Sequence, residues 1–119
     1  MKFTEEHEWL VLDGDTVTVG ITEHAATQLG DVVYVELPET GLVVAPGDDV
    51  VVIESVKAAS DILAPLEGEI TAVNTRLTTE PGLVNEDPLG AGWVFRMRID
   101  DPSVLDDLMD EDAYRALID

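Results

Sequence analysis

The feature that most constrains the fold is a succession of short apolar runs, rich in β-branched residues and bounded by turn residues. Such runs predict β-strands, and their number and spacing are typical of an all-β sandwich or barrel. Residues 50–56 form the most apolar run, which suits a strand in the core of a sandwich. Further strands are expected over residues 8–12, 16–21, 31–37, 42–45, 60–63, 69–74 and 93–99.

Two helical segments are expected to interrupt this pattern. Thr22 can cap a short helix that stops at Gly30. Ser103, followed three residues later by Asp106, matches a capping-box pattern for a C-terminal helix, and residues 112–118 can add one or two helical turns. The predicted fold is therefore mainly β, a flattened barrel or sandwich with a short inner helix and a C-terminal helical segment.

Length and composition restrict the classes of protein that this chain can represent. Its 119 residues are expected to form a single domain, residues 1–119. With 6 Lys and Arg against 26 Asp and Glu, the formal net charge is −20, which excludes a basic nucleic-acid surface. The chain has no Cys, so it can form neither disulfides nor thiolate metal sites. No apolar run approaches the roughly 20 residues that span a bilayer, and the first residues resemble no signal or transit peptide, so we expect a cytoplasmic protein.

The acidic residues are spread along the chain and are not gathered in a tail. Net charge of this size destabilises a small fold by self-repulsion at low ionic strength. At about 1 M salt the Debye length falls to about 3 Å, and this repulsion is screened. Two explanations of the acidity stay open, an ordinary solvated surface and adaptation to a salt-rich cytoplasm. The charge disfavours self-association at low salt, and we expect a monomer.

Motifs for catalysis and for metal binding are missing from the sequence. None of the three serines lies in a Gly-x-Ser-x-Gly motif, and no phosphate-binding Gly-x-x-x-x-Gly-Lys occurs. The histidines, His7 and His24, do not form a His-x-x-x-His pair, so no zinc site is expected. Adjacent acids are frequent by chance in so acidic a chain and indicate no function by themselves.

One lysine stands out, because the chain contains only Lys2 and Lys57. Lys57 follows the apolar run 50–56 and precedes two alanines, which predicts an accessible position at the tip of a β-turn. Glu54 lies three residues before it and Asp61 four residues after it. A primary amine on a flexible stem can be acylated, and a cofactor attached there could visit other proteins at high effective concentration. The alternatives are an ordinary surface lysine and a Schiff-base lysine, which needs a buried pocket that a turn tip does not offer.

Short motifs that together form a specific pattern occur in order through nearly the whole chain. They are His7-Glu8-Trp9, Val19-Gly20-Ile21-Thr22, Leu29-Gly30-Asp31-Val32-Val33, Val35-Glu36-Leu37-Pro38, Glu54-Ser55-Val56-Lys57-Ala58, Ser60-Asp61, Asn85-Glu86-Asp87-Pro88 and Gly92-Trp93. With these motifs, the sequence around Lys57 closely resembles the lipoyl-lysine site of the glycine cleavage system H protein family. Biotin carriers flank their lysine with methionines, and lipoyl domains of 2-oxo acid dehydrogenases usually place Asp before it, whereas here Val56 precedes Lys57 and Ala58 follows it.

The resemblance implies a non-catalytic carrier with lipoic acid attached by an amide bond to Lys57. In the family, the P-protein (glycine decarboxylase) loads the arm with an aminomethyl group. The T-protein (aminomethyltransferase) transfers the one-carbon unit to tetrahydrofolate, and the L-protein (dihydrolipoamide dehydrogenase) reoxidises the arm. A lipoylating enzyme is the fourth partner. Three alternatives stay open: a relay carrier that passes lipoyl or octanoyl groups to other proteins, an enzyme that uses Lys57 as a Schiff-base nucleophile, and an acidic interaction module without cofactor.

Three acidic residues are candidates for a cleft that shelters the arm or for recognition during lipoylation. The residues that match Glu8 and Asp61 line this cleft in the family, where an acid near a protonated amine is electrostatically favourable. Asp61 could instead be a turn residue or, like Glu54, a recognition acid for the lipoylating enzyme, and Glu8 an ordinary surface strand residue. Trp9 is expected in the core or the cleft wall, and His7 at a hydrogen-bonding edge.

Overall fold

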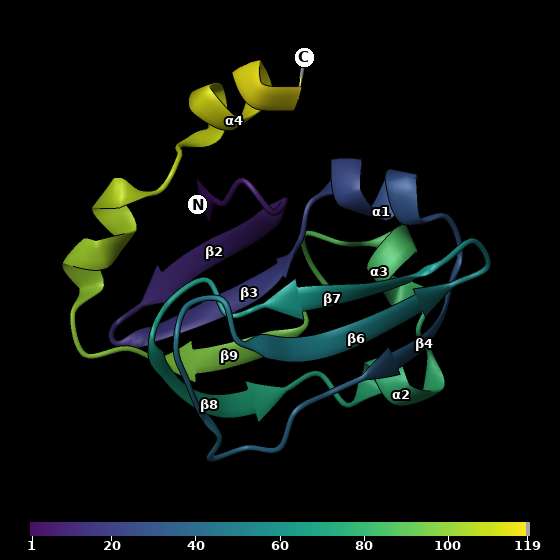
Figure 1. The fold of residues 1–119 in the computed structure, drawn as a ribbon, viewed down its shortest axis with the longest axis horizontal. Coiled ribbons are helices and arrows are strands. Elements are labelled where there is room, and N and C mark those ends of the chain that lie inside the picture. Colours follow the sequence, from purple (N-terminus) through teal and green to yellow (C-terminus); the bar gives the residue numbers. More distant parts are fainter. Residues whose placement is uncertain (119) are drawn as a thin grey trace.

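The structure is a computed structural model that describes residues 1–118, and it consists of two antiparallel sheets packed as a sandwich (Figure 1). This confirms the predicted mainly β sandwich; within the described residues the sheets do not close into a barrel. In spatial order, the larger sheet contains β1 (Lys2–Phe3), β2 (Glu8–Asp13), β3 (Thr16–Ile21), β9 (Phe95–Arg98), β8 (Gly68–Val73) and β5 (Val43–Val44). The smaller sheet contains β4 (Val32–Glu36), β6 (Asp49–Ser55) and β7 (Ala59–Leu63).

The core lies between the inner faces of these two sheets. Side chains alternate along a strand between its two faces, so Val17 and Val19 of β3 point inward together. They belong to one buried cluster with Phe95 of β9 and with Val51 and Ile53 of β6. Full burial of each such side chain stabilises the fold by about 1.5–3 kcal/mol. This packing fixes which face of β6 is outward, and so determines the orientation of the hairpin that β6 and β7 form.

Helix α1 (Glu23–Leu29) follows β3 and matches its prediction. The Thr22 hydroxyl accepts a hydrogen bond from the Ala25 N–H at 3.3 Å, and Gly30 ends the helix at φ 75°, in the left-handed region that favours glycine. Two single-turn helices, α2 (Arg76–Thr79) and α3 (Leu83–Glu86), were not predicted, because four residues are too few to show helical periodicity. None of the helices within residues 1–118 has the length and apolar character needed to cross a membrane.

The C-terminal segment begins with the 3₁₀ helix η1 (Pro102–Asp107) and ends with α4 (Glu111–Ile118). The prediction that Ser103 caps this segment is wrong: the cap is Asp101, whose Oδ1 accepts hydrogen bonds from the Ser103 N–H at 3.1 Å and hydroxyl at 2.6 Å. Proline suits the first turn of a helix because its N–H is missing and its φ is fixed, so the cap falls before Pro102. The two bonds from Ser103 lower the pKa of Asp101.

Tyr114 attaches α4 to the body of the protein. Its ring stacks on Phe3, with the centroids 4.7 Å apart and an angle of 10° between the planes. Its hydroxyl forms hydrogen bonds with Nδ1 of His7 at 2.9 Å and with Oγ1 of Thr22 at 2.7 Å. His7 therefore lies at a hydrogen-bonding edge, as expected. The C-terminal helix is held next to the segment that leads into β2.

Candidate functional site

Lys57 lies in the exposed turn between β6 and β7, at one end of the molecule (Figure 1). The Ser55 side chain organises this turn: its hydroxyl donates to the carbonyl of Ala58 at 3.1 Å and accepts from the N–H groups of Lys57 and Ala58, both at 3.2 Å. The Ser55 N–H also donates to the Ala58 carbonyl at 2.8 Å. All the hydrogen-bonding capacity of the Ser55 hydroxyl is used in this way, which gives the exposed turn a defined shape.

The stem of Lys57 lies against Gly30, at the end of α1. A methyl group placed on Gly30 would stand 3.1 Å from Cε and 3.6 Å from Nζ of Lys57. Such a methyl group would crowd the stem, and the positive φ of Gly30 would strain any side chain there. The glycine therefore serves two purposes, ending the helix and leaving room for the lysine.

Asn85 of α3 fixes the segment on which Lys57 rests. Its Oδ1 accepts from the Val32 N–H at 2.8 Å, and its Nδ2 donates to the carbonyl of Gly30 at 2.8 Å. The carbonyl of Asp31, between these two residues, accepts from the N–H of Val56 at 3.0 Å. Asn85 thus holds the chain that pairs with the lysine hairpin. The sequence contained this residue within the Asn85-Glu86-Asp87-Pro88 motif but gave no sign of its contacts.

The rest of this motif anchors the neighbouring strand. Trp9 is buried, and its indole N–H donates to the carbonyl of Pro88 at 2.9 Å. Asp87 receives a bond from the Ala91 N–H at 2.9 Å, and its carbonyl receives one from the Gly92 N–H at 2.8 Å. The expectation that Trp9 belongs to the core is confirmed, and β2, which carries Glu8 next to it, is held firmly in place.

A cavity of about 280 Å³ runs along β7, the strand that follows the turn of Lys57. Leu29, the neighbour of Gly30, and Ser60, three residues after Lys57, both line it. Its walls are mixed, with aliphatic side chains and a small number of polar groups. The lining residues are Glu6, His7, Glu8, Ile21, Ala25, Gln28, Leu29, Ile53, Ser60, Asp61, Ile62 and Leu63. The structure therefore brings Glu8 and Asp61, 53 positions apart in the sequence, to one cavity lined by the second strand of the lysine hairpin.

Glu8 is a buried carboxylic acid and not a surface strand residue, since only 3% of it is exposed. The Thr4 hydroxyl donates to its Oε1 at 3.1 Å, whereas its Oε2 has no hydrogen-bond partner within residues 1–118. Burial raises the pKa of Glu8 to about 8; the Thr4 hydrogen bond opposes this shift and the nearby Glu6 carboxylate adds to it. At neutral pH the site therefore offers a largely protonated acid with one unused oxygen.

The other two predicted acids are exposed and differ in position. Asp61 lies on the edge strand β7 and lines the cavity with Glu8. Glu54 pairs with Tyr34 and Ala59 across the sheet and is not among the residues that line the cavity. A role of Glu54 in recognition during lipoylation therefore stays a prediction. The open position of Lys57 also lacks the enclosed pocket that a Schiff-base lysine needs.

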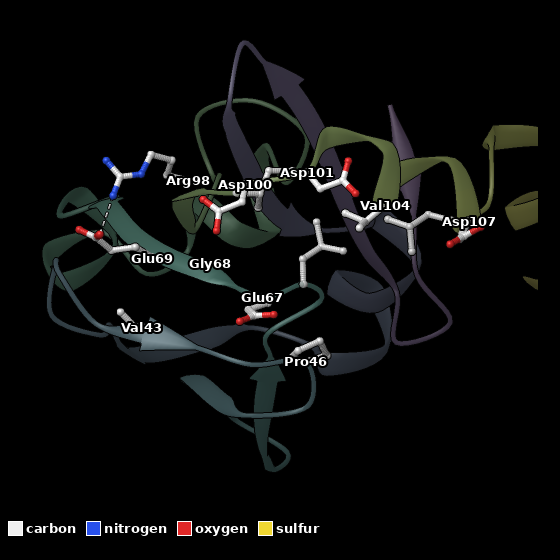
Figure 2. A pocket seen from close by; sticks show the side chains of 13 residues that line it. Val43, Pro46, Glu67, Gly68, Glu69, Arg98, Asp100, Asp101, Val104 and Asp107 are labelled. Carbon is white, nitrogen blue, oxygen red and sulfur yellow. Dashed lines mark hydrogen bonds and ion pairs between the residues drawn. The ribbon is translucent and has the colours of Figure 1, made fainter.

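A larger cavity of about 580 Å³ lies elsewhere, between β8, β9 and η1 (Figure 2). Its rim carries Glu67, Glu69, Asp100, Asp101 and Asp107, and its one base, Arg98, forms a 2.8 Å ion pair with Glu69. None of the predicted site residues lines it. The larger cavity is therefore separate from the residues of the Lys57 site. Within residues 1–118, no group of three or more His, Asp or Glu side chains is arranged to hold a metal ion.

A two-sheet sandwich that presents a lysine at a hairpin turn is the architecture of lipoyl- and biotin-carrier proteins. Within this class, the chain belongs to the glycine cleavage H-protein family, whose family model matches residues 1–119. A solved structure of a glycine cleavage system H protein from Mycobacterium marinum is similar to it, with a TM-score of 0.86 and 36% sequence identity over 97% of this chain and 93% of that chain. Members of this family are lipoyl carriers and not catalysts.

Proposed function

We propose that this chain carries lipoic acid in amide linkage to Nζ of Lys57 and shuttles an aminomethyl group from the P-protein to the T-protein of glycine cleavage. The observation that supports this most directly is the position of Lys57. The lysine is exposed at a turn with a defined shape, and its stem rests on Gly30. The strand that follows this turn, β7, lines the cavity that holds Glu8 and Asp61. The arm could therefore reach out to a partner or fold back onto its own carrier.

The residues of the cavity fit such an arm. When bound, the lipoyl group supplies a disulfide that accepts the one-carbon unit and is later regenerated by the L-protein. Its hydrocarbon chain requires an apolar wall, which Ile21, Leu29, Ile53 and Ile62 provide. An arm folded against this apolar wall would shield a hydrolysis-prone group from solvent.

Glu8 and Asp61 give the cavity a preference for a cationic group. The free Oε2 of Glu8 can accept a hydrogen bond from a protonated amine, and a positive charge nearby favours the ionised carboxyl. A carboxylate paired with an ammonium group forms a charge-assisted hydrogen bond. Glu8 would therefore be protonated while the cavity is empty and would give up its proton when an amine enters.

Glycine–bicarbonate exchange with the P-protein tests this function. The unsubstituted protein and both variants are first treated with a lipoylating enzyme. Lys57→Arg is then compared with Lys2→Arg, which changes the only other lysine of the chain in the same way. We expect Lys57→Arg to lose exchange and Lys2→Arg to retain it, with unchanged thermal unfolding of both variants. Full exchange by Lys57→Arg would refute the proposal, and loss of folding in that variant would show that the lysine is structural.

A further inference from the structure

We infer that a patch of exposed apolar residues on β4 and the hairpin, made of Val33, Tyr34 and Val56 and called here the β4 patch, is the docking surface for the enzyme that acylates Lys57. This inference rests on the proposed function, because it requires Lys57 to be the acceptor of an acyl group. The three residues are 55%, 49% and 66% exposed, respectively.

A β-bulge at Val33 exposes two neighbouring residues of this patch, Val33 and Tyr34. Val32 pairs with Ser55 and Tyr34 pairs with Glu54, so Val33 is an extra residue without a partner on β6. In a regular strand, successive side chains point to opposite faces, and one of two neighbours would be buried. Here both Val33 and Tyr34 are exposed. Bulges occur at sheet edges and next to active sites, where they redirect side chains.

Backbone pairing places the patch directly beside the acceptor lysine. The hydrogen bond from the Val56 N–H to the Asp31 carbonyl, 3.0 Å long, joins the start of β4 to the residue that precedes Lys57. Tyr34 lies opposite Glu54, three residues before the lysine. The cavity lies on the other side of the hairpin, because β6 separates β4 from β7. A partner on the patch can therefore approach Lys57 from the side opposite the cavity.

The composition of the patch is that of a protein interface. Val33 and Tyr34 are exposed on β4, an edge strand of the smaller sheet, and Val56 is exposed in the hairpin turn. Edge strands are normally protected by charged residues, and exposed apolar patches mark interaction sites. Tyrosine is one of the residues that contribute most to binding energy when a partner covers them. The exposed carboxylates nearby are Asp31, just before β4, Glu36 on β4 and Glu54 on β6. The partner surface is thus expected to be apolar in its centre and to carry Lys or Arg around it.

An acylating enzyme has a chemical reason to cover this region. The lysine Nζ attacks the carbonyl carbon of an activated acyl group, such as an acyl adenylate held by the enzyme. The amide C–N bond forms, the bond from the acyl carbon to the phosphate oxygen breaks, adenylate leaves with that electron pair, and Nζ loses a proton to a base. The amine must be held at the acyl carbon for this step, so the enzyme must bind the surface immediately around Lys57.

The test is a steady-state kinetic study of lipoylation of the full-length, unmodified protein. A purified lipoylating enzyme receives lipoate and ATP, and intact mass gives initial rates over a range of carrier concentrations. The variants are Tyr34→Ser, Val33→Ser and Val56→Ser. Val43→Ser is the matched control, because Val43 is 71% exposed on the edge strand β5 and lies away from the hairpin. Thermal unfolding of each variant is measured to check that the fold is intact.

We expect Tyr34→Ser to raise KM by about tenfold or more, which corresponds to about 1.4 kcal/mol of lost binding, while kcat stays near that of the unsubstituted protein. The two valine variants should raise KM by a smaller factor, and Val43→Ser should leave both constants unchanged. Unchanged kinetics in all three patch variants would overturn the inference, as would a fall in kcat without a rise in KM. Normal lipoylation of these variants combined with failure to exchange with the P-protein would assign the patch to that partner instead. If the unsubstituted protein is not lipoylated at all, the proposed function itself fails.

Discussion

The hydroxyl of Thr4 donates a hydrogen bond to Oε1 of Glu8 at 3.1 Å and accepts one from the backbone N–H of Glu8 at 3.2 Å. This pair of bonds fixes one oxygen of a buried carboxyl group while the other oxygen has no partner within residues 1–118. The acid is therefore oriented but not neutralised by any cation. Its protonation depends on pH and on what enters the cavity, and the effect of pH on stability follows directly.

The first prediction concerns this pH dependence. The pKa of Glu8 is about 8 in the folded protein and close to 4.5 in the unfolded chain. Between these values the folded state holds a proton that the unfolded state releases, so the free energy of unfolding falls as the pH rises. The contribution of Glu8 is fully present below about pH 4.5 and is lost as the pH rises through about 8. Glu8→Gln should remove this slope and be more stable at pH 9 by a few kcal/mol, of order 3–5 by linkage.

Urea unfolding at several pH values, in about 1 M KCl to screen the other carboxylates, measures this effect. Glu6→Gln is the control, because Glu6 is an exposed acid that lines the same cavity. Glu6→Gln should keep most of the fall in unfolding free energy with rising pH. If this free energy changes with pH in parallel for the unsubstituted protein and Glu8→Gln, the raised pKa of Glu8 is contradicted.

The second prediction concerns Asn85. Asn85→Ala leaves the Val32 N–H and the Gly30 carbonyl without their 2.8 Å partners, and we expect a loss of about 2–3 kcal/mol in the free energy of unfolding. Glu86→Ala, an exposed neighbour on α3, should change stability by less than about 0.5 kcal/mol. Equal stability of the two variants in denaturant unfolding would show that Asn85 does not hold the segment under Lys57.

The third prediction concerns the attachment of the C-terminal helix. Tyr114→Phe keeps the ring that stacks on Phe3 but removes the hydroxyl that bonds to His7 and Thr22. We expect a loss of about 1–2 kcal/mol, measured by chemical unfolding. Tyr34→Phe is the same substitution at a half-exposed residue and should have almost no effect on stability. A larger loss in the second variant than in the first would refute this account of α4.

The fourth prediction concerns salt. The ion pairs within residues 1–118 are exposed, join Arg76 to Glu80, Arg98 to Glu69 and Arg115 to Glu111, and contribute at most about 1 kcal/mol each. Within residues 1–118 these pairs involve only three of the acidic residues. Screening should therefore relieve more repulsion than attraction, and the melting temperature should rise steeply between about 0.1 and 2 M KCl. A melting temperature that is flat over this range would leave an ordinary solvated surface as the explanation of the acidity.

Much of the fold could be predicted because its signals are local. Short β-branched apolar runs between turn residues located the strands, and Thr22 and Gly30 marked both ends of α1. Lys57 was recognisable as an accessible turn residue because two alanines follow a strand that must be buried. Local signals also misled once, at Ser103, where the cap belongs to Asp101 because a proline lies between them.

The remaining features depend on contacts that are distant in the sequence. Glu8 lies close to the exposed acids Glu5 and Glu6, and nothing in this stretch distinguishes the one acid that is buried. Its burial results from the assembly of β2, β7 and α1 around one cavity. Likewise, Asn85 contacts Val32 across 53 positions, and the bulge at Val33 exists only through the pairing of β4 with β6.

The central claim, that Lys57 is the point of cofactor attachment, is tested most directly by mass spectrometry. The protein is incubated with a lipoylating enzyme, lipoate and ATP, and its intact mass and peptide map are measured, with Lys57→Arg and Lys2→Arg treated in parallel. We expect one lipoyl increment on the unsubstituted protein and on Lys2→Arg, confined to the peptide that contains Lys57, and none on Lys57→Arg. An unmodified Lys57, under conditions that fully load an established lipoyl carrier, would contradict the account.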